Sequence, residues 1–522
     1  MLVHRFLEEA ARRTPESESL IEVQRTTTYG ALDRLANRFA NLYVSGGVRR
    51  GDRIVVALEN SREFVAAYFG ALKAGAVAVP LPPGPRSDRL ERAMVDCSPA
   101  AAVVDAATVA AATGEHPLLK VKQRIVLGHG RSSDHSSGVS LDDALAGHSE
   151  DNPPVRCIDL DLAAIIYTSG TTGEPRGVML THRNLVTNAR SIVSYLALTM
   201  HDRVMCVLPF YYVYGLSLLH THVAVGGSIV IDNRFAFPNV VVQAMRDRAV
   251  TGFAGVPSTF ALLLHRSSIS SVPQPELRYV TQAGGAMSAA HIREWLERGP
   301  AVPFYVMYGA TEAAARLTYL EPARLQEKLG SIGRPIPNVE IVVLKEDGSV
   351  AAPGEVGELV ARGSNIASGY WNKPEETRER FGPEGYRTGD LGYADDEGFL
   401  FLVGRKHDMI KIGAHRVGPR EIEEVLLEHP LVHEAAVVAA SDEILGEVAV
   451  AFVSLRERGT VTAEALRDHC ASRLPSYKVP SRFSFRSELP KIAGIGKIDK
   501  RALSASVATA ASGAPAGTGV AI

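Results

Sequence analysis

The feature that most constrains this chain is the alternation of short apolar runs with amphipathic segments along roughly its first 330 residues. The runs Ile54–Leu58 and Ala76–Val79 are continuously apolar, whereas Leu32–Leu42 repeats apolar residues at intervals of three and four. Continuous short runs are typical of strands buried on both faces, and the wider spacing is typical of helices. The pattern predicts an α/β fold with parallel or mixed sheets covered by helices. Further strands are expected at Ala101–Val104, Ile125–Leu127, Ile165–Tyr167, Met205–Leu208, Ile229–Ile231 and Tyr305–Met307.

The pattern of apolar residues changes near residue 333, where short stretches with strand-like alternation are separated by glycine-containing turns. This predicts a small antiparallel β-rich subdomain at about 333–404. A separate α+β unit is expected at 405–504, and residues 505–522 are mostly small, without a core pattern. Because 522 residues exceed one compact core, we expect a large N-terminal domain (1–404), a small C-terminal domain and a disordered tail.

The charge balance and the cysteines exclude several classes of protein. Lys and Arg number 56 and Asp and Glu 58, with no basic run, so nothing indicates a nucleic-acid partner. No stretch has the roughly 18 apolar residues that a membrane-spanning helix needs, and the N-terminus lacks the apolar core of a signal peptide. The four cysteines are scattered, without metal-ligand spacing: Cys97, Cys157, Cys206 and Cys470. We expect a soluble, cytoplasmic enzyme.

A loop rich in glycine and hydroxyl side chains follows the strand that ends at Tyr167. Its residues are Thr168, Ser169, Gly170, Thr171, Thr172 and Gly173, and Glu174-Pro175-Arg176-Gly177 come next. Backbone N–H groups and hydroxyls in such a loop can surround phosphate oxygens. The loop matches neither a Walker A motif nor GxGxxG. The strand before it and the Pro-Arg-Gly after it favour a phosphate-binding loop over a flexible linker.

Two further motifs carry groups suited to a nucleotide. In Tyr308-Gly309-Ala310-Thr311-Glu312, the aromatic ring can stack on adenine, the threonine can bond a phosphate and the carboxylate can hold Mg²⁺. In Thr388-Gly389-Asp390, the two carboxylate oxygens suit a vicinal diol such as that of ribose. Alone, each motif is more often an ordinary polar turn.

Residues 167–185, YTSGTTGEPRGVMLTHRNL, resemble the phosphate loop of the adenylate-forming enzymes, a superfamily of acyl- and aryl-CoA synthetases, peptide-synthetase adenylation domains and beetle luciferases. The resemblance extends over roughly residues 5–503, through five motifs in the family's order. It implies an N-terminal adenylation domain, a mobile C-terminal domain and an active site at their junction. The implied reaction joins a carboxylic acid to ATP, giving acyl-adenylate and pyrophosphate, and then transfers the acyl group to a thiol.

The resemblance also implies the role of each site residue. Nucleotide contacts would come from Thr168, Ser169, Gly170, Thr171, Thr172, Gly173, Arg176, Gly284, Gly285, Ala286, Tyr308, Gly309, Thr311, Glu312, Asp390 and Arg405. Glu312 and Thr168 would hold the metal, Lys497 would be catalytic and His407 would be the hinge between the domains. The acyl pocket would contain Tyr212, Tyr214, Gly215, Val256 and Ser258. The thiol path would contain Gly413, Ala414 and Arg416.

The chain departs from the family's pattern at several of these positions. Arg176 replaces the commoner lysine, which keeps the charge but changes its geometry. Tyr212 stands where many relatives carry histidine, His407 where Asp or Lys is usual, and Ala414 where glycine is commoner. Upstream of Lys497 the segment is one residue longer than usual, which makes Lys491 and Lys500 the natural controls for its role.

The leading hypothesis is an AMP-forming acyl-CoA synthetase that uses ATP, Mg²⁺ and coenzyme A. One alternative is an amino-acid adenylation domain, which the absence of an acidic residue in 208–218, LPFYYVYGLSL, disfavours. Another is an acyl-AMP ligase that loads the phosphopantetheine of a carrier protein, and a third is a non-catalytic binding module. The acid itself, whether fatty, aryl or polycyclic, is not specified by the sequence. A homodimer is among the assemblies that the resemblance allows.

Overall fold

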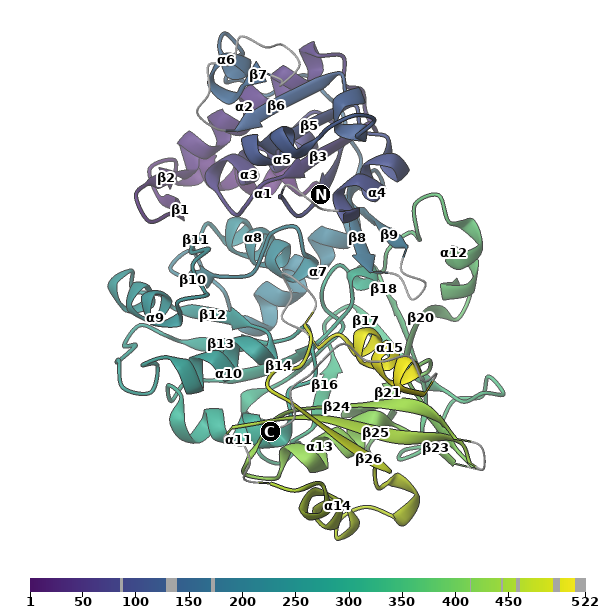
Figure 1. The fold of residues 1–522 in the computed structure, drawn as a ribbon. Helices are drawn as coiled ribbons and strands as arrows, with labels where there is room; N and C mark the ends of the chain where they lie inside the picture. The colour runs from purple at the N-terminus through teal and green to yellow at the C-terminus, as the bar shows by residue number, and fades with distance from the viewer. Residues whose placement is uncertain are drawn as a thin grey trace.

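A computed structural model describes residues 1–84, 88–127, 139–169, 174–413, 415–442, 445–456, 461–491 and 498–511. In this part of the chain the strands form three sheets, and helices cover the sheets of the N-terminal part (Figure 1). The predicted fold class, α/β with a small second domain, is confirmed. The serine-rich stretch 129–138 lies outside the described residues.

The first sheet has seven described strands in the order β7-β6-β5-β3-β4-β8-β9. Its strands are β3 (Arg53–Ala57), β4 (Val77–Pro80), β5 (Ala101–Asp105), β6 (Gln123–Leu127), β7 (Val139–Ser140), β8 (Leu162–Ser169) and β9 (Pro175–Thr181). All pair in parallel except β8 and β9, which form an antiparallel hairpin. Residues pointing to either face are buried, as the continuous apolar runs predict. The helices of this part of the chain are α1 (His4–Arg13), α2 (Tyr29–Ser45), α3 (Arg62–Lys73), α4 (Asp88–Cys97), α5 (Ala106–Ala111) and α6 (Leu141–Leu145).

The second sheet joins the remaining α/β strands to the β-rich subdomain. Its first half contains β1 (Glu18–Ile21), β2 (Thr26–Thr28), β10 (Arg203–Cys206), β11 (Ser228–Ile231), β12 (Gly252–Gly255), β13 (Tyr279–Gln282) and β14 (Phe304–Tyr308). The helices around it are α7 (His182–Leu196), α8 (Val213–Val225), α9 (Pro238–Asp247), α10 (Pro257–Arg266) and α11 (Ala289–Arg298). Strands β10 to β14 are parallel, so their carboxyl ends lie at one edge of the sheet.

The β-rich subdomain is continuous with this sheet and is not a separate layer. Its strands are β15 (Thr318–Leu320), β16 (Ser331–Pro335), β17 (Val339–Leu344), β18 (Gly357–Gly363), β19 (Phe381–Gly382), β20 (Gly385–Ala394) and β21 (Leu400–Arg405), with α12 (Pro374–Arg380) between β18 and β19. Strand β15 pairs with both β14 and β16, and β16 pairs with β21. The boundary predicted at 333 therefore falls inside β16, because antiparallel pairing carries the sheet across it.

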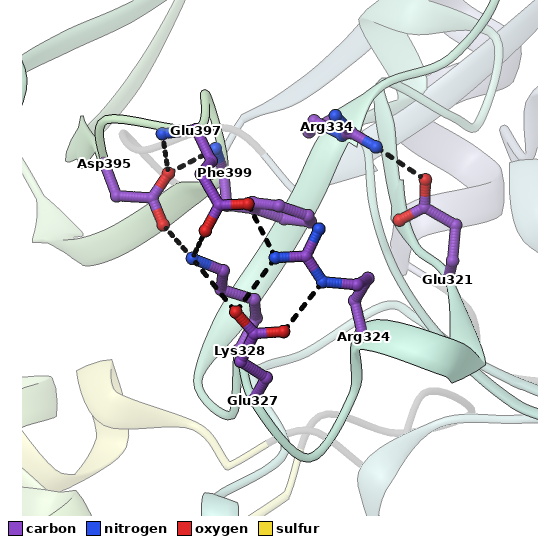
Figure 2. Close-up of polar contacts among 8 residues, drawn as sticks. All are labelled: Glu321, Arg324, Glu327, Lys328, Arg334, Asp395, Glu397 and Phe399. Carbon is purple, nitrogen blue, oxygen red and sulfur yellow. Dashed lines mark hydrogen bonds and ion pairs between the residues drawn. The ribbon is translucent and has the colours of Figure 1, made fainter.

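A charged cluster around Phe399 fixes the turn between β20 and β21 (Figure 2). The ring is fully buried, and Arg324, Lys328 and Arg334 lie over it at 4.9, 5.0 and 4.7 Å from its centroid. Carboxylates balance these cations: Asp395 and Glu397 pair with Lys328, Glu327 and Glu397 pair with Arg324, and Glu321 pairs with Arg334. Because the turn sets the register of β20 against β21, it also positions the residues near the end of β21.

The third sheet forms the C-terminal unit. It contains β22 (Ile410–Ile412), β23 (His415–Val417), β24 (Val432–Asp442), β25 (Gly446–Leu455) and β26 (Arg482–Arg486). Its helices are α13 (Pro419–Leu427), α14 (Ala463–Ala471) and α15 (Lys500–Ala511). Helix α13 contacts β21 and α11 of the N-terminal part. Within the described ranges, no helix is both long enough and apolar enough to cross a membrane.

The last described helix extends into the segment that the sequence assigns to the tail. Disorder is expected from residue 505, but α15 continues to Ala511. Its Leu503 and Val507 are buried in a cluster with Val438 and Val450. Two apolar residues four positions apart present one helical face to the sheet, which the small-residue composition conceals.

Candidate active site

The glycine-rich loop connects the two strands of the β8–β9 hairpin. Thr168 pairs with Arg176 and Ser169 with Pro175, so Thr168 and Arg176 lie opposite each other where the hairpin enters the loop. The predicted phosphate contacts Gly170, Thr171, Thr172 and Gly173 lie outside the described residues. The loop is followed by the strand β9 and not by a helix, which agrees with its not being a Walker A motif.

Arg176 lies beside the predicted metal ligand. Its guanidinium forms an ion pair with Glu376 of α12 and lies over the ring of Tyr370, with 5.6 Å between the guanidinium carbon and the ring centroid. The Tyr370 hydroxyl donates to Oε1 of Glu312 at 2.8 Å. Burial and the neighbouring Glu312 charge raise the pKa of Tyr370 far above its usual value, so it remains a donor. One tyrosine thus bridges two residues that the sequence assigns to the phosphates and the metal.

Glu312 follows β14 in a short 3-10 helix, η3 (Thr311–Ala313). The turn before it depends on Gly309, because a Cβ there would collide with the carbonyl of Ala315. Ala314 and Ala315 then have positive φ, 53° and 111°. Non-glycine residues seldom adopt such angles, and strain of this kind is concentrated at functional sites.

Three of the predicted nucleotide contacts converge at Asp390. Its Oδ2 accepts a hydrogen bond from the hydroxyl of Tyr308 at 2.5 Å, and its Oδ1 accepts one from Nε of Arg405 at 3.1 Å. Asp390 lies on β20 and Arg405 on β21, as directly paired residues. Burial and the Asp390 charge raise the pKa of Tyr308 well above its usual value. Residues more than 80 positions apart thus meet through sheet pairing.

A buried carboxylate that the sequence analysis did not single out holds this region together. Glu358 of β18 is 7% exposed and accepts from the backbone N–H of Gly389, from Arg387 and from Lys406. It therefore ties the turn before Asp390 to the residue after Arg405. The sequence signal for Glu358 was a lone acid inside the apolar stretch GELVA. The signal for Tyr370 was an aromatic residue in the loop before α12.

The predicted nucleotide contacts Gly284, Gly285 and Ala286 follow β13 and lie next to the predicted acyl pocket. Gly284 has φ of +82°, and a Cβ there would lie 3.0 Å from Cγ1 of Val256. Gln282 donates to the carbonyl of Gly285 at 2.8 Å, which closes the turn after β13. Val256 caps the start of α10, which also carries Ser258. The ends of β12 and β13 therefore bring the two predicted subsites side by side.

The rest of the predicted acyl pocket lies at the start of α8. Tyr212 is its N-cap, and a Cβ on Gly215 would collide with the carbonyl of Pro209. The Tyr214 hydroxyl lies 3.0 Å from the hydroxyl and 3.1 Å from the carbonyl oxygen of Thr281, on β13. Burial raises the pKa of Tyr214 to about 12. The structure therefore gives Tyr214 a positioned hydroxyl beside the sheet edge.

The predicted hinge lies between two sheets. His407 occupies an exposed turn after β21 and before β22. Gly413, with φ of +57°, donates to the carbonyl of Leu445, and Ala414 lies outside the described residues. Arg416 of β23 forms its ion pair with Glu346, in the turn after β17. In this arrangement Arg416 contacts the β-rich subdomain, and of the described thiol-path residues neither Gly413 nor Arg416 has a hydrogen bond or ion pair with Asp390.

The predicted catalytic residue Lys497 lies outside the described residues, but the residues that flank it do not. Lys491 forms a β-bridge with Ile498, and the N–H of Asp499 donates to the carbonyl of Pro490 at 2.7 Å. Lys491 pairs with Glu434 at 2.9 Å, and Lys500 pairs with Glu423 at 2.6 Å. Both control lysines therefore have carboxylate partners within the C-terminal unit.

Comparison with known families decides what this arrangement belongs to. The profile of the AMP-binding enzyme family matches residues 7–371, and that of the AMP-binding enzyme C-terminal domain matches residues 421–497. The chain belongs to the AMP-binding enzyme family. This confirms the family predicted from the motifs, the AMP-forming acyl-CoA ligases.

Similar proteins cover nearly the whole chain. The long-chain-fatty-acid–CoA ligase FadD13 of Mycobacterium tuberculosis is 31% identical over 496 residues, covering 93% of this chain and 95% of the relative. The 2-succinylbenzoate–CoA ligase of Bacillus subtilis is 31% identical over 506 residues, covering 93% and 94%. Among solved structures, the anthranilate CoA ligase AuaEII with anthranoyl-AMP has a TM-score of 0.90 at 26% identity and covers 98% of each chain. The B. subtilis o-succinylbenzoate CoA synthetase with its acyl-adenylate has a TM-score of 0.83 at 30% identity, covering 95% of this chain and 97% of that one.

Proposed function

We propose that this chain uses ATP and Mg²⁺ to convert a carboxylic acid to acyl-AMP and pyrophosphate, and then transfers the acyl group to coenzyme A. The observation that carries the proposal is the convergence of Tyr308, Asp390 and Arg405 beside the Tyr370–Glu312 pair. It brings onto adjoining elements an aromatic ring, the carboxylate expected to bind a diol and the carboxylate expected to hold a metal, which supports the proposal. Relatives and solved neighbours with CoA-ligase names cover nearly the same length of chain.

Glu312 fits the role of a magnesium ligand. Its Oε1 accepts from Tyr370, and no described residue donates to its second oxygen. The described residues contain no cluster of three or more His, Cys, Asp or Glu side chains suited to a metal. Because Mg²⁺ is usually held by one or two carboxylates together with substrate phosphates, a single glutamate is sufficient here. Bound Mg²⁺ would neutralise charge on the phosphates, while Tyr370, with Arg176 over its ring, holds the carboxylate in place.

Asp390 is the candidate for the ribose hydroxyls. In this structure both of its oxygens already accept hydrogen bonds, from Tyr308 and Arg405. A ribose diol would replace or share these donors, so binding of the nucleotide would be coupled to the position of Arg405. Since Arg405 is followed directly by the hinge turn, that coupling links the nucleotide to the orientation of the C-terminal domain.

The alternatives differ in acceptor and in substrate charge. Loading of a carrier protein uses the same first step and a different thiol, so the acceptor decides between them. An amino-acid substrate would bring an ammonium group to the acyl pocket. The buried guanidinium of Arg316 lies over the ring of the predicted pocket residue Tyr214, 4.7 Å from its centroid, and it would repel an ammonium group brought into the same pocket. This observation disfavours an amino acid.

A pyrophosphate-release screen over fatty, aryl, polycyclic and amino acids tests the proposal, followed by thioester detection with and without coenzyme A. ATP-dependent release with at least one acid, and a thioester only when coenzyme A is present, is the expected result. Release that proceeds without any thioester to coenzyme A would favour a carrier protein, and no release with any acid would refute the activity. We further infer a cytoplasmic location, and a homodimer remains the assembly to test.

A further inference from the structure

Arg316 is a buried cation next to the proposed acyl pocket. It is 2% exposed, among the largest fully buried side chains of the protein. It comes four residues after Glu312 and directly after the strained turn at Ala314 and Ala315. Buried arginines are rare unless a carboxylate balances them.

The partners of Arg316 leave its charge unbalanced. Nη1 donates to the carbonyl of Ala315 at 3.2 Å, and the guanidinium lies over the ring of Tyr214, with Tyr195 nearby. Nε is buried and has no hydrogen-bond partner among the described residues, and no carboxylate there forms an ion pair with it. A guanidinium has five donors, and it binds carboxylates in a two-pronged geometry.

The backbone around Arg316 is fixed from outside the pocket. Asn188 of α7 and Asn365 both donate to the carbonyl of Arg316, at 3.1 and 2.8 Å. Together with the positive φ angles before it, these bonds fix the Cα of Arg316 close to Tyr214, whose hydroxyl lies at Thr281 on β13. The unbalanced charge is therefore built into the site.

We propose that Arg316 binds a second carboxylate on the acid substrate, so that the enzyme acts on dicarboxylic acids. This inference rests on the proposed function, since it names the substrate class of the same site. The first carboxylate, aimed at the nucleotide, would react. The second would lie against Arg316 with Tyr195 and Tyr214 beside it. Arg316 would thus determine specificity, because its buried positive charge stays without a carboxylate partner whenever the distal group of the acid is apolar.

The decisive comparison uses matched pairs of acids that differ only in the distal group. Straight-chain dicarboxylates of four to eight carbons, terephthalate and 2-succinylbenzoate are tested against their monomethyl esters in the pyrophosphate-release assay. We expect kcat/KM for the preferred diacid to exceed that for its ester by at least about 100-fold. The variant Arg316→Met should lose most of this ratio, mainly through the diacid, and Arg316→Lys should retain part of it.

The outcomes separate this inference from the proposed function. If the wild type adenylates monoesters or fatty acids as well as diacids, or if Arg316→Met lowers both members of a pair equally, the inference is wrong although the activity stands. If no acid causes pyrophosphate release, the proposed activity is refuted. The proposed binding of a diacid by Arg316 is then tested separately, by the thermal shift that the acids cause. A shift of the wild type by a diacid, absent with its monoester and absent in Arg316→Met, would then support it. Equal shifts, or none with any diacid, would overturn it, and circular dichroism of the variant distinguishes misfolding from loss of binding.

Discussion

Asp390 accepts a hydrogen bond from Arg405 across the β20–β21 pair, with 3.1 Å between Oδ1 and Nε. Arg405 is the last residue of its strand, and the next three residues form the turn that leads into the C-terminal sheet. A residue proposed to bind ribose is therefore bonded to the residue from which the second domain departs. Because both oxygens of Asp390 already accept hydrogen bonds, we expect nucleotide binding at Asp390 to alter its bond to Arg405 at this junction.

Asp390→Ala should weaken ATP binding specifically. The variant loses the two proposed charge-assisted hydrogen bonds from the ribose hydroxyls to the carboxylate, each worth about 1.5–3 kcal/mol at most. The KM for ATP should therefore rise about 10-fold or more. KM for the acid should change little. The matched control is Asp396→Ala, an exposed carboxylate in the turn of the same hairpin. Steady-state kinetics with ATP and with the acid measure both KM values. If the KM for ATP and the kcat of Asp390→Ala equalled those of the wild type, the assignment of Asp390 to the ribose would be contradicted.

Glu312→Gln should depress adenylation while leaving the fold intact. The amide keeps a hydrogen-bond acceptor for Tyr370 but removes the charge that a magnesium ion requires, so kcat should fall about 10²–10³-fold. Tyr370→Phe is the matched control. It removes the 2.8 Å bond but retains the carboxylate, and its loss should be smaller. Magnesium titration of pyrophosphate release measures both, and normal turnover of Glu312→Gln at saturating Mg²⁺ would rule the residue out as ligand.

Much of this site could be predicted because its residues lie in local motifs. The loop after β8, Tyr308 to Glu312 and Asp390 are each recognisable within a few neighbours in sequence. Likewise, the continuous apolar runs correctly predict β3, β4 and β5, because a strand buried on both faces must be apolar throughout.

The parts that sequence did not predict depend on contacts between distant residues. Tyr370 reaches Glu312 across 58 positions, and Glu358 reaches Gly389 across 31. The positive φ at Ala315 is equally hidden, since alanine gives no sign of a left-handed backbone and only the position of Gly309 against its carbonyl explains the turn. Sheet continuity through β16 similarly arises from strand pairing and not from composition.

Stability should fall as the solution is acidified, partly through His182. Burial lowers the pKa of His182 to about 4, and its Nδ1 accepts the N–H of Val3 at 3.2 Å, which requires a neutral ring atom. The folded pKa lies below the unfolded value, so the unfolded state binds the proton more tightly. The contribution is present above about pH 6.5 and is lost as pH falls towards 4.

His182→Gln tests this dependence, because glutamine retains an acceptor and does not titrate. Between about pH 7.5 and pH 5 the wild type should lose about 1–2 kcal/mol more unfolding free energy than the variant, given an unfolded pKa of about 6.5. Urea unfolding at the two pH values measures the difference. Parallel losses in both proteins would show that His182 is not responsible.

His407→Pro should affect the two half-reactions unequally. His407 lies in the exposed turn between β21 and β22, and no described residue accepts a backbone hydrogen bond from its N–H, so proline would restrict φ without removing a bond. The contacts between the domains include the exposed pairs Arg456–Glu294 and Arg416–Glu346, which oppose rotation weakly. Adenylation and thioester formation should be measured separately, with His407→Ala as the control. Equal loss of both half-reactions would remove the argument for a hinge.

Lys497→Ala should cripple adenylation and spare thioester formation from presynthesised acyl-adenylate. When a carboxylate attacks the α-phosphorus, negative charge develops on oxygens that an ammonium group can bridge. Losing such a group costs about 10²–10³-fold, on the order of 3–4 kcal/mol. The structure sharpens the controls, because Lys491 and Lys500 are held by Glu434 and Glu423 within the C-terminal unit.

The alanine variants of these two lysines should therefore be mild in both half-reactions. Their ion pairs are partly exposed and stabilise the domain only slightly. A lysine whose ammonium group reaches the α-phosphate in the N-terminal domain cannot at the same time pair with a glutamate of the C-terminal unit. Single-turnover measurements of each half-reaction compare the three variants directly. If Lys500→Ala shows the selective adenylation defect and Lys497→Ala does not, the catalytic lysine has been assigned to the wrong position.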